Sequence, residues 1–143
     1  MKKNLTQMVF VLDMSGSMKW LAPETIGGYN TMLADQKKED GDALVTTVLF
    51  DNRYIMVHDG VDIKKVQNLT DKEYRPEGMT AMLDAVGRTI NHVGNRLADM
   101  PEEERPEKVV FTIITDGYEN ASHEFDWNTV CLLYTSPSPR DCS

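Results

Sequence analysis

The chain has 143 residues, which is enough for one domain with a single sizeable core. Its hydrophobic fraction of 41% and its aromatic fraction of 8% are ordinary for a soluble globular protein. The formal net charge of -8 argues against nucleic acid and anionic membranes as partners, because both are bound through clustered lysines and arginines. An acidic protein partner would also be repelled, unless a bound cation reversed the local field.

The chain shows no secretion signal and no disulfide framework. The apolar run from Met8 to Leu12 ends at Asp13, so it is too short for a signal-peptide core or for a membrane span. Cys131 and Cys142 are the two cysteines, and both lie near the C-terminal end. We therefore expect a cytoplasmic protein.

The C-terminal segment CLLYTSPSPRDCS (131–143) differs in composition from the residues before it. A disordered tail rich in serine and proline is one interpretation. A second interpretation is read-through from library DNA, because codons can be chosen for Cys131 to Cys142 that resemble a transposase-type sequencing adapter. We favour the second, and we expect a partial domain over residues 4–130 followed by a non-native, adapter-derived tail over residues 131–143.

Hydrophobic patterning predicts that strands and helices alternate along the chain. Strands are expected at residues 7–13, 43–50, 54–58 and 108–116, and helices at 25–38, from Thr80 to Leu97, and from about Ser122. The strand at 54–58 follows a turn and is expected to be an antiparallel edge strand. The other strands are continuously apolar, as in parallel strands buried on both faces. Residues 61–76 and 101–108 are polar and are expected to be mainly loops.

This order of elements predicts an α/β fold. We expect a doubly wound, Rossmann-like, mostly parallel sheet with one antiparallel edge strand, helices on both faces, and the last strands missing.

Two of the buried strands are predicted to end in aspartates, Asp13 and Asp116. In open α/β sheets, ligands bind beyond the carboxyl ends of the strands, where the strand order reverses. If these two strands are neighbours across that reversal, both carboxylates point into one crevice. Right-handed crossovers would bring the start of the helix at Thr80 close to the same crevice.

The loop after the first strand adds hydroxyl groups, because Ser15 and Ser17 alternate with Met14 and with Gly16, which lets the loop curl. The complete set of oxygen donors is Asp13, Ser15, Ser17, Thr80 and Asp116. Such hard donors, without imidazole or thiolate, suit Mg²⁺ or Mn²⁺ and disfavour zinc or copper. Two carboxylates about balance the charge of the ion and hydroxyls add none, so the ion should remain attractive to a further carboxylate.

Three segments carry a resemblance to a known family. VFVLDMSGSM (9–18) is similar to the first part of the metal-ion-dependent adhesion site (MIDAS) of von Willebrand factor A domains. GMTAMLDAV (78–86) resembles the threonine loop of that family, and FTIITDGYENAS (111–122) resembles its T-D-G segment, especially in small bacterial and phage-encoded members. The resemblance covers residues 4–130, and the three segments occur in the family order.

The resemblance implies a binding module rather than an enzyme, with no catalytic residues. In the family, the ion bridges to an aspartate or glutamate of a partner protein, so Mg²⁺ or Mn²⁺ on the five residues would do the same here. Neither nucleic acid nor a membrane is expected as a partner.

Simpler explanations exist for each residue taken alone. Asp13 and Ser15 could shape a turn, Thr80 could cap a helix, and Asp116 could begin an ordinary turn. Together, however, these roles would leave two buried carboxylates without a cation, which is costly. A purely structural domain with a vestigial site is disfavoured by the full ligand set.

The alternative from another class is a metal-dependent phosphoester hydrolase that uses the same aspartate-lined crevice. No candidate base stands beside the metal loop in the sequence. Asp13 is also not followed by the second acid of a D-x-D phosphatase motif.

The proposed truncation gives a first prediction. The resemblance implies about two further helix–strand units of roughly 30 residues each, and without them the strand at 108–116 is an exposed apolar edge that promotes aggregation. We expect the natural continuation after Val130 to raise both solubility and the melting temperature. Equal melting temperatures with and without the extension, measured by differential scanning fluorimetry, would contradict the truncation.

Overall fold

The computed structural model describes residues 2–79 and 81–115. Its strands and α-helices are β1 (Lys2–Asp13), α1 (Ala22–Lys38), β2 (Asp42–Phe50), β3 (Tyr54–Asp62), α2 (Met82–Ala98) and β4 (Pro106–Ile114). Short 3-10 helices lie in the connections, η1 (Gly16–Leu21), η2 (Ile63–Lys65) and η3 (Glu102–Glu104). Thr80, Asp116, the helix expected near Ser122 and the tail at 131–143 fall outside the described residues.

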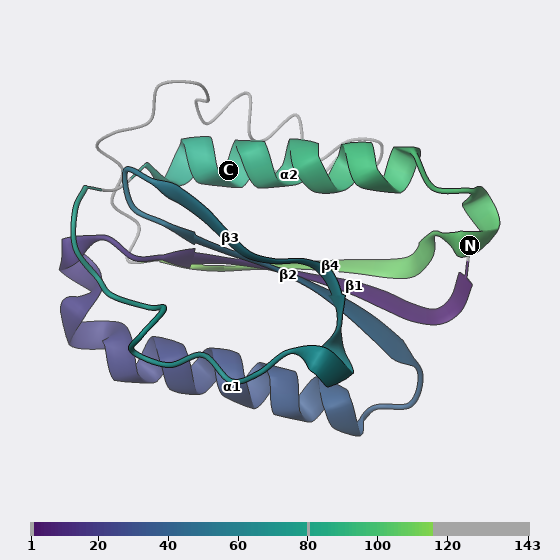
Figure 1. The fold of residues 1–143 in the computed structure, drawn as a ribbon, viewed down its shortest axis with the longest axis horizontal. Coiled ribbons are helices and arrows are strands. Elements are labelled where there is room, and N and C mark those ends of the chain that lie inside the picture. The colour runs from purple at the N-terminus through teal and green to yellow at the C-terminus, as the bar shows by residue number, and fades with distance from the viewer. Residues whose placement is uncertain (1, 80, 116–143) are drawn as a thin grey trace, which may run out of the picture.

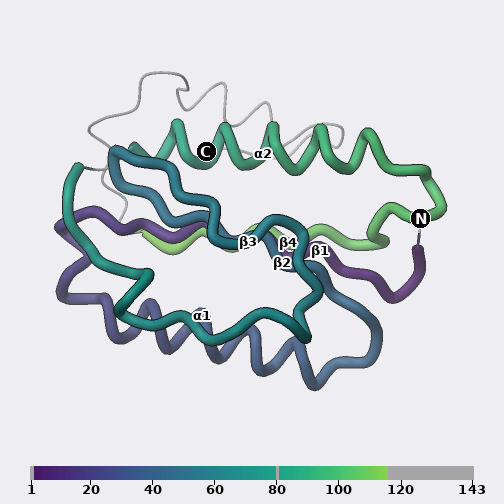
Figure 2. Tube along the Cα trace, in the orientation of Figure 1, coloured from purple at the N-terminus to yellow at the C-terminus, as the bar shows by residue number. Residues whose placement is uncertain are grey.

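The strands form one sheet in the order β3-β2-β1-β4 (Figures 1 and 2). β1 pairs in parallel with β2 and with β4, and β3 runs antiparallel to β2 at the edge. The strand order reverses at β1, because the connection through α1 leads to β2 on one side and the later connection through α2 leads to β4 on the other. The predicted doubly wound, mostly parallel sheet with an antiparallel edge strand is therefore confirmed, and β1 lies at its switch point.

One helix covers each face of the sheet, as Figure 1 shows. Phe10 and Leu12 of β1 belong to the core under α1, together with Tyr29 of that helix. Val9 and Val11 belong to the core under α2. Successive residues of β1 thus enter opposite cores, and all four β1 residues named here are 0% exposed. This explains why β1 is continuously apolar instead of alternating. Among the described residues, no helix has the length and apolar character needed to cross a membrane.

All four strands extend beyond the ranges that the sequence patterns predicted; β1 begins at Lys2 instead of residue 7, and β2 begins one residue early at Asp42. β3 continues past His58 to Asp62 through an irregularity in its pairing with β2. Gly60 makes this possible, since its φ of 63° is in the left-handed region and its N–H donates to Thr46 Oγ1 at 3.0 Å. β4 begins at Pro106, two residues before the predicted strand start at Lys108, so the prediction of a loop was wrong at residues 106 and 107. A proline fits at the first residue of a strand, where its missing N–H breaks no ladder.

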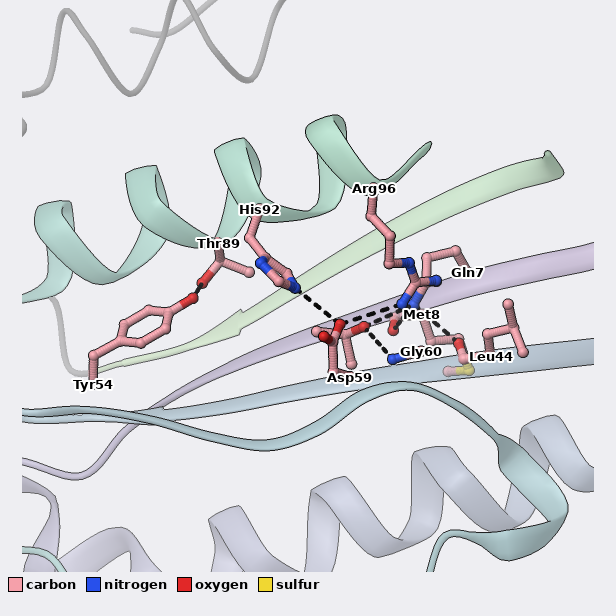
Figure 3. Close-up of polar contacts among 10 residues, drawn as sticks. Gln7, Met8, Leu44, Tyr54, Asp59, Gly60, Thr89, His92 and Arg96 are labelled. Atoms are coloured by element: carbon pink, nitrogen blue, oxygen red, sulfur yellow. Dashed lines mark hydrogen bonds and ion pairs between the residues drawn. The ribbon is translucent and has the colours of Figure 1, made fainter. Parts of the chain in front are cut away.

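A polar network fastens α2 to the sheet (Figure 3). Arg96 Nη2 donates to Oε1 of Gln7 at 2.6 Å, and Gln7 is 0% exposed on β1. Arg96 Nη1 also donates to Asp59 Oδ1 at 3.3 Å, and His92 Nε2 lies 2.9 Å from the same oxygen. Gly60 leaves room for this arrangement, because a Cβ there would lie 1.7 Å from Arg96 Nη1. The network joins α2 to the central strand and to the antiparallel edge strand.

The network gives a prediction for stability. Arg96→Met leaves the buried Gln7 Oε1 without its donor, so we expect the free energy of unfolding to fall by about 1–3 kcal/mol. Arg88→Met is the matched control, since the Arg88 guanidinium lies over the Tyr54 ring at 4.1 Å on an exposed part of α2. In this variant the free energy of unfolding should fall by less than about 1 kcal/mol. If urea denaturation gave equal decreases in the free energy of unfolding for the two variants, the network would not be what fastens α2.

Candidate metal centre

The centre is built on Asp13, the last residue of β1. Asp13 is 0% exposed, at the carboxyl end of a strand that lies between β2 and β4. Its Oδ1 accepts a hydrogen bond from the Ser15 backbone N–H, and its Oδ2 accepts one from the Thr115 hydroxyl, both at 2.8 Å. Its carbonyl oxygen accepts a hydrogen bond from the Tyr74 hydroxyl. The strand end and its carboxylate are therefore both held in place.

The Asp13 carboxylate is not neutralised by the described part of the chain. No lysine, arginine or histidine among residues 2–79 and 81–115 forms an ion pair with it. Its two hydrogen bonds use only part of the roughly four lone-pair sites of a carboxylate. Burial of an unpaired carboxylate is costly, so this position favours a bound cation.

Asp51 provides an internal comparison, because it directly follows the neighbouring strand β2 and is also buried, at 1% exposed. Arg53 Nη2 donates to its Oδ2 at 2.7 Å, and the Arg53 backbone N–H donates to its Oδ1 at 2.6 Å. The hydrogen bond and the charge of Asp51 raise the pKa of the Arg53 guanidinium. Asp51 thus has a cation of its own, whereas no residue within 2–79 and 81–115 supplies one to Asp13.

The hydroxyl groups of Ser15 and Ser17 lie together in the loop after Asp13. Their Oγ atoms are 3.1 Å apart; Ser15 is 1% exposed and Ser17 is exposed. Oxygens in adjacent positions of an octahedron with Mg–O bonds of 2.0–2.1 Å are about 2.9 Å apart. The two hydroxyls therefore have a spacing that fits neighbouring positions around one magnesium ion.

The simpler explanation of these residues holds only in part. Asp13 does shape the turn, through its bond to the Ser15 N–H. Ser15 precedes η1 as its N-cap, but its side chain makes no capping hydrogen bond. Its hydroxyl is instead directed to Ser17, so helix capping does not account for it.

The segment around Gly78 forms a second wall of the centre. The Gly78 carbonyl accepts a hydrogen bond from the Gly16 N–H at 3.1 Å, and the Glu77 N–H donates to the Met14 carbonyl at 2.9 Å. Further along, the Ala81 N–H donates to the Asp51 carbonyl at 3.2 Å. Gly78 is needed at this close approach, because its φ is 80° and a Cβ there would lie 2.7 Å from the Asn52 amide oxygen.

Three of the five predicted ligands are described, and the structure brings Asp13, Ser15 and Ser17 together beyond the carboxyl end of β1. Thr80 and Asp116 lie outside the described residues. Within the described ranges, no three side chains of histidine, cysteine, aspartate or glutamate gather closely enough to hold a metal ion. A site at this loop would therefore depend on hydroxyl oxygens, as the sequence predicts.

Sequence reasoning missed two residues that support the centre. Asp51 carries the same signal as Asp13, an aspartate directly after an apolar run, but its pairing with Asn52 in the sequence predicts only a turn. Tyr74 comes from the segment at 61–76 that was expected to be a polar loop. It is 1% exposed and belongs to the core under α1, together with Ile63, Val66 and Leu69 of the same segment.

Comparisons with known proteins bear on the fold. No protein-family model matches the chain, and no curated protein sequence matches it. Proximal thread matrix protein 1 from the mussel byssus matches with a TM-score of 0.55 and 19% identity, over 95% of this chain and 34% of that one. A second structure of the same protein, described as having a zinc-occupied MIDAS motif, matches with a TM-score of 0.51 and 21% identity, over 90% of this chain and 32% of that one.

Two bacterial proteins have the same fold. The N-terminal domains of the type V pili tip protein Mfa5 from Porphyromonas gingivalis match with a TM-score of 0.53 and 17% identity, over 80% of this chain and 20% of that one. An aerotolerance-related membrane protein from Bacteroides fragilis matches with a TM-score of 0.52 and 16% identity, over 92% of this chain and 63% of that one. This chain thus spans only part of the length of each of these proteins. It has the fold of the von Willebrand factor A domains, as its three motifs predicted.

Proposed function

We propose that this chain is a divalent-metal-dependent protein-binding module in which Asp13, Ser15, Ser17, Thr80 and Asp116 hold Mg²⁺ or Mn²⁺. The observation that carries the proposal is the buried Asp13 carboxylate, which has no cationic partner in the described residues. The 3.1 Å spacing of the two serine hydroxyls beside it supports an ion with octahedral oxygen ligands. The mussel protein shares this fold and is described with a zinc-occupied MIDAS motif, which supports a divalent metal in a module of this kind, although the donors here favour magnesium or manganese over zinc.

The charges of the ion, its ligands and the chain indicate what kind of partner would bind. A bound ion with two carboxylates and three hydroxyls is about neutral, and magnesium takes six ligands, so it can still accept an oxygen from outside. A carboxylate of a partner protein, from aspartate or glutamate, fits that position. Since the chain carries a net charge of -8, such a partner would be repelled without the metal. Binding should therefore depend strictly on the ion.

The proposal predicts that magnesium stabilises the protein through Asp13. At a magnesium concentration of 100 times the dissociation constant, the free energy of unfolding should rise by about 2.7 kcal/mol. Asp13→Ala should abolish this rise, because it removes the buried charge that the ion compensates. Asp42→Ala is the matched control, since Asp42 is exposed at the opposite end of β2. The measurement is thermal unfolding with magnesium and with EDTA.

Two outcomes would contradict the proposal. The first is a magnesium effect that survives in Asp13→Ala at the wild-type size. The second is magnesium-dependent hydrolysis of p-nitrophenyl phosphate that Asp13→Ala abolishes, because this would favour the phosphoester hydrolase.

Tyr74 gives a second prediction, since its hydroxyl fixes the carbonyl of the residue that would bind the ion. Tyr74→Phe should lower the free energy of unfolding by about 0.5–1.5 kcal/mol and weaken magnesium affinity by roughly tenfold. Tyr29→Phe is the matched control for Tyr74→Phe, because it also removes a buried tyrosine hydroxyl. That hydroxyl lies 2.8 Å from Thr47 Oγ1 in the core. This control should cost similar stability but leave magnesium affinity unchanged. Equal affinities in the two variants, measured by calorimetric titration, would remove Tyr74 from the site.

A further inference from the structure

η1 carries an exposed tryptophan beside the candidate metal loop. Trp20 is 90% exposed, more than any other large apolar side chain among the described residues. A single exposed apolar side chain is ordinary on a protein surface, so the position of Trp20 beside the metal loop is what carries the argument. Tryptophan is also among the residue types most enriched at positions that dominate the energy of protein–protein binding.

The geometry of η1 places Trp20 next to Ser17. A 3-10 helix has three residues per turn, so the side chains of residues three apart lie above one another on one side of the helix. Ser17 and Trp20 are such a pair, and both are exposed. With a rise of about 2.0 Å per residue, they are about 6 Å apart along the helix axis. Met18 is 1% exposed and anchors η1 to the core, so the helix cannot roll to bury Trp20.

Two further apolar side chains near the metal loop are exposed. Leu21 of η1 is 43% exposed, and Met79 is 53% exposed. Met79 follows Gly78, whose carbonyl accepts a hydrogen bond from the N–H of Gly16 at the start of η1. We call Trp20, Leu21 and Met79 the apolar rim. Lys19, one residue before Trp20 in η1, is exposed and forms no ion pair with any residue that the structure describes. Its free positive charge suits an acidic partner.

We propose that the apolar rim determines which acidic protein segments this module binds. This inference rests on the proposed function. The partner is an extended segment in which an apolar side chain lies two positions from the aspartate or glutamate that reaches the metal. In an extended chain, residues two apart point to the same side and are about 6.6 Å apart, which matches the separation of Ser17 and Trp20. The apolar side chain packs on Trp20 while the carboxylate reaches the ion.

The test is selection of a phage-displayed random heptapeptide library on the full chain in magnesium, with elution by EDTA. We expect the eluted peptides to contain an aspartate or glutamate with an aromatic or aliphatic residue two positions away. Selection on Trp20→Ala should keep the acidic residue and lose the apolar preference, and Trp20→Phe should restore it. Because Trp20 is 90% exposed, these substitutions leave the fold intact.

The best wild-type peptide, labelled with fluorescein, allows the effect to be measured by anisotropy. Trp20→Ala should raise its Kd about tenfold. Val109→Ala is the control for an exposed apolar residue away from the centre, being 38% exposed in the middle of β4, and should leave Kd unchanged. Lys19→Glu should weaken binding, whereas Lys64→Glu at the opposite end of the sheet should not.

The outcomes separate the two proposals. EDTA-eluted acidic peptides without an apolar preference, or an unchanged Kd in Trp20→Ala, would overturn the role of the rim and leave the proposed function standing. If no acidic peptide elutes with EDTA, the proposed function fails and the role of the rim fails with it.

Discussion

The Asp13 carboxylate is buried at the end of the central strand and has no cationic side chain in contact with it over residues 2–79 and 81–115. The structure around β1 accounts for that burial. β1 is apolar from Met8 to Leu12 because helices cover both faces of the sheet, and Asp13 ends this run at the carboxyl end of the strand, where the strand order reverses. The loops after β1 and β2 and the segment around Gly78 meet at that end through backbone hydrogen bonds, which fix the loop that carries the carboxylate.

Asp13 and Asp51 show how similar local patterns lead to different chemistry. Each aspartate ends an apolar run, each is buried, and each accepts a hydrogen bond from the backbone N–H two residues later. The difference lies in the side chain at that later position. Arg53 folds back and neutralises Asp51, whereas Ser15 offers a neutral hydroxyl that lies 3.1 Å from the Ser17 hydroxyl. One carboxylate is therefore part of the scaffold, and the other is available to a cation.

The sequence predicted the features that depend on local patterns. The buried strands, the two helices and the order of the elements follow from apolar spacing, and the D-x-S-x-S spacing predicted that Asp13, Ser15 and Ser17 share one loop. Features that depend on contacts distant in sequence were not predicted. The extra length of β3 depends on Thr46 accepting from the Gly60 N–H, and Tyr74 reaches the Asp13 carbonyl across 61 residues. No periodicity in the chain encodes such contacts.

The position of the second wall depends on how α2 is held along its length. α2 begins two residues after Thr80, and its N-cap residue Ala81 makes no side-chain capping bond. Apolar packing on the sheet holds the helix from Met82 to Leu97, and the bond from Arg96 to the buried Gln7 adds a polar attachment at its last turns. With a rise of about 1.5 Å per residue, the attachments at Met82 and Arg96 are about 20 Å apart along the axis. A helix fixed at both ends cannot slide, so the segment that leads into it keeps its position against the Asp13 loop. The core under α2 therefore helps to fix the position of the segment around Gly78 relative to the Asp13 loop, together with the hydrogen bonds between them.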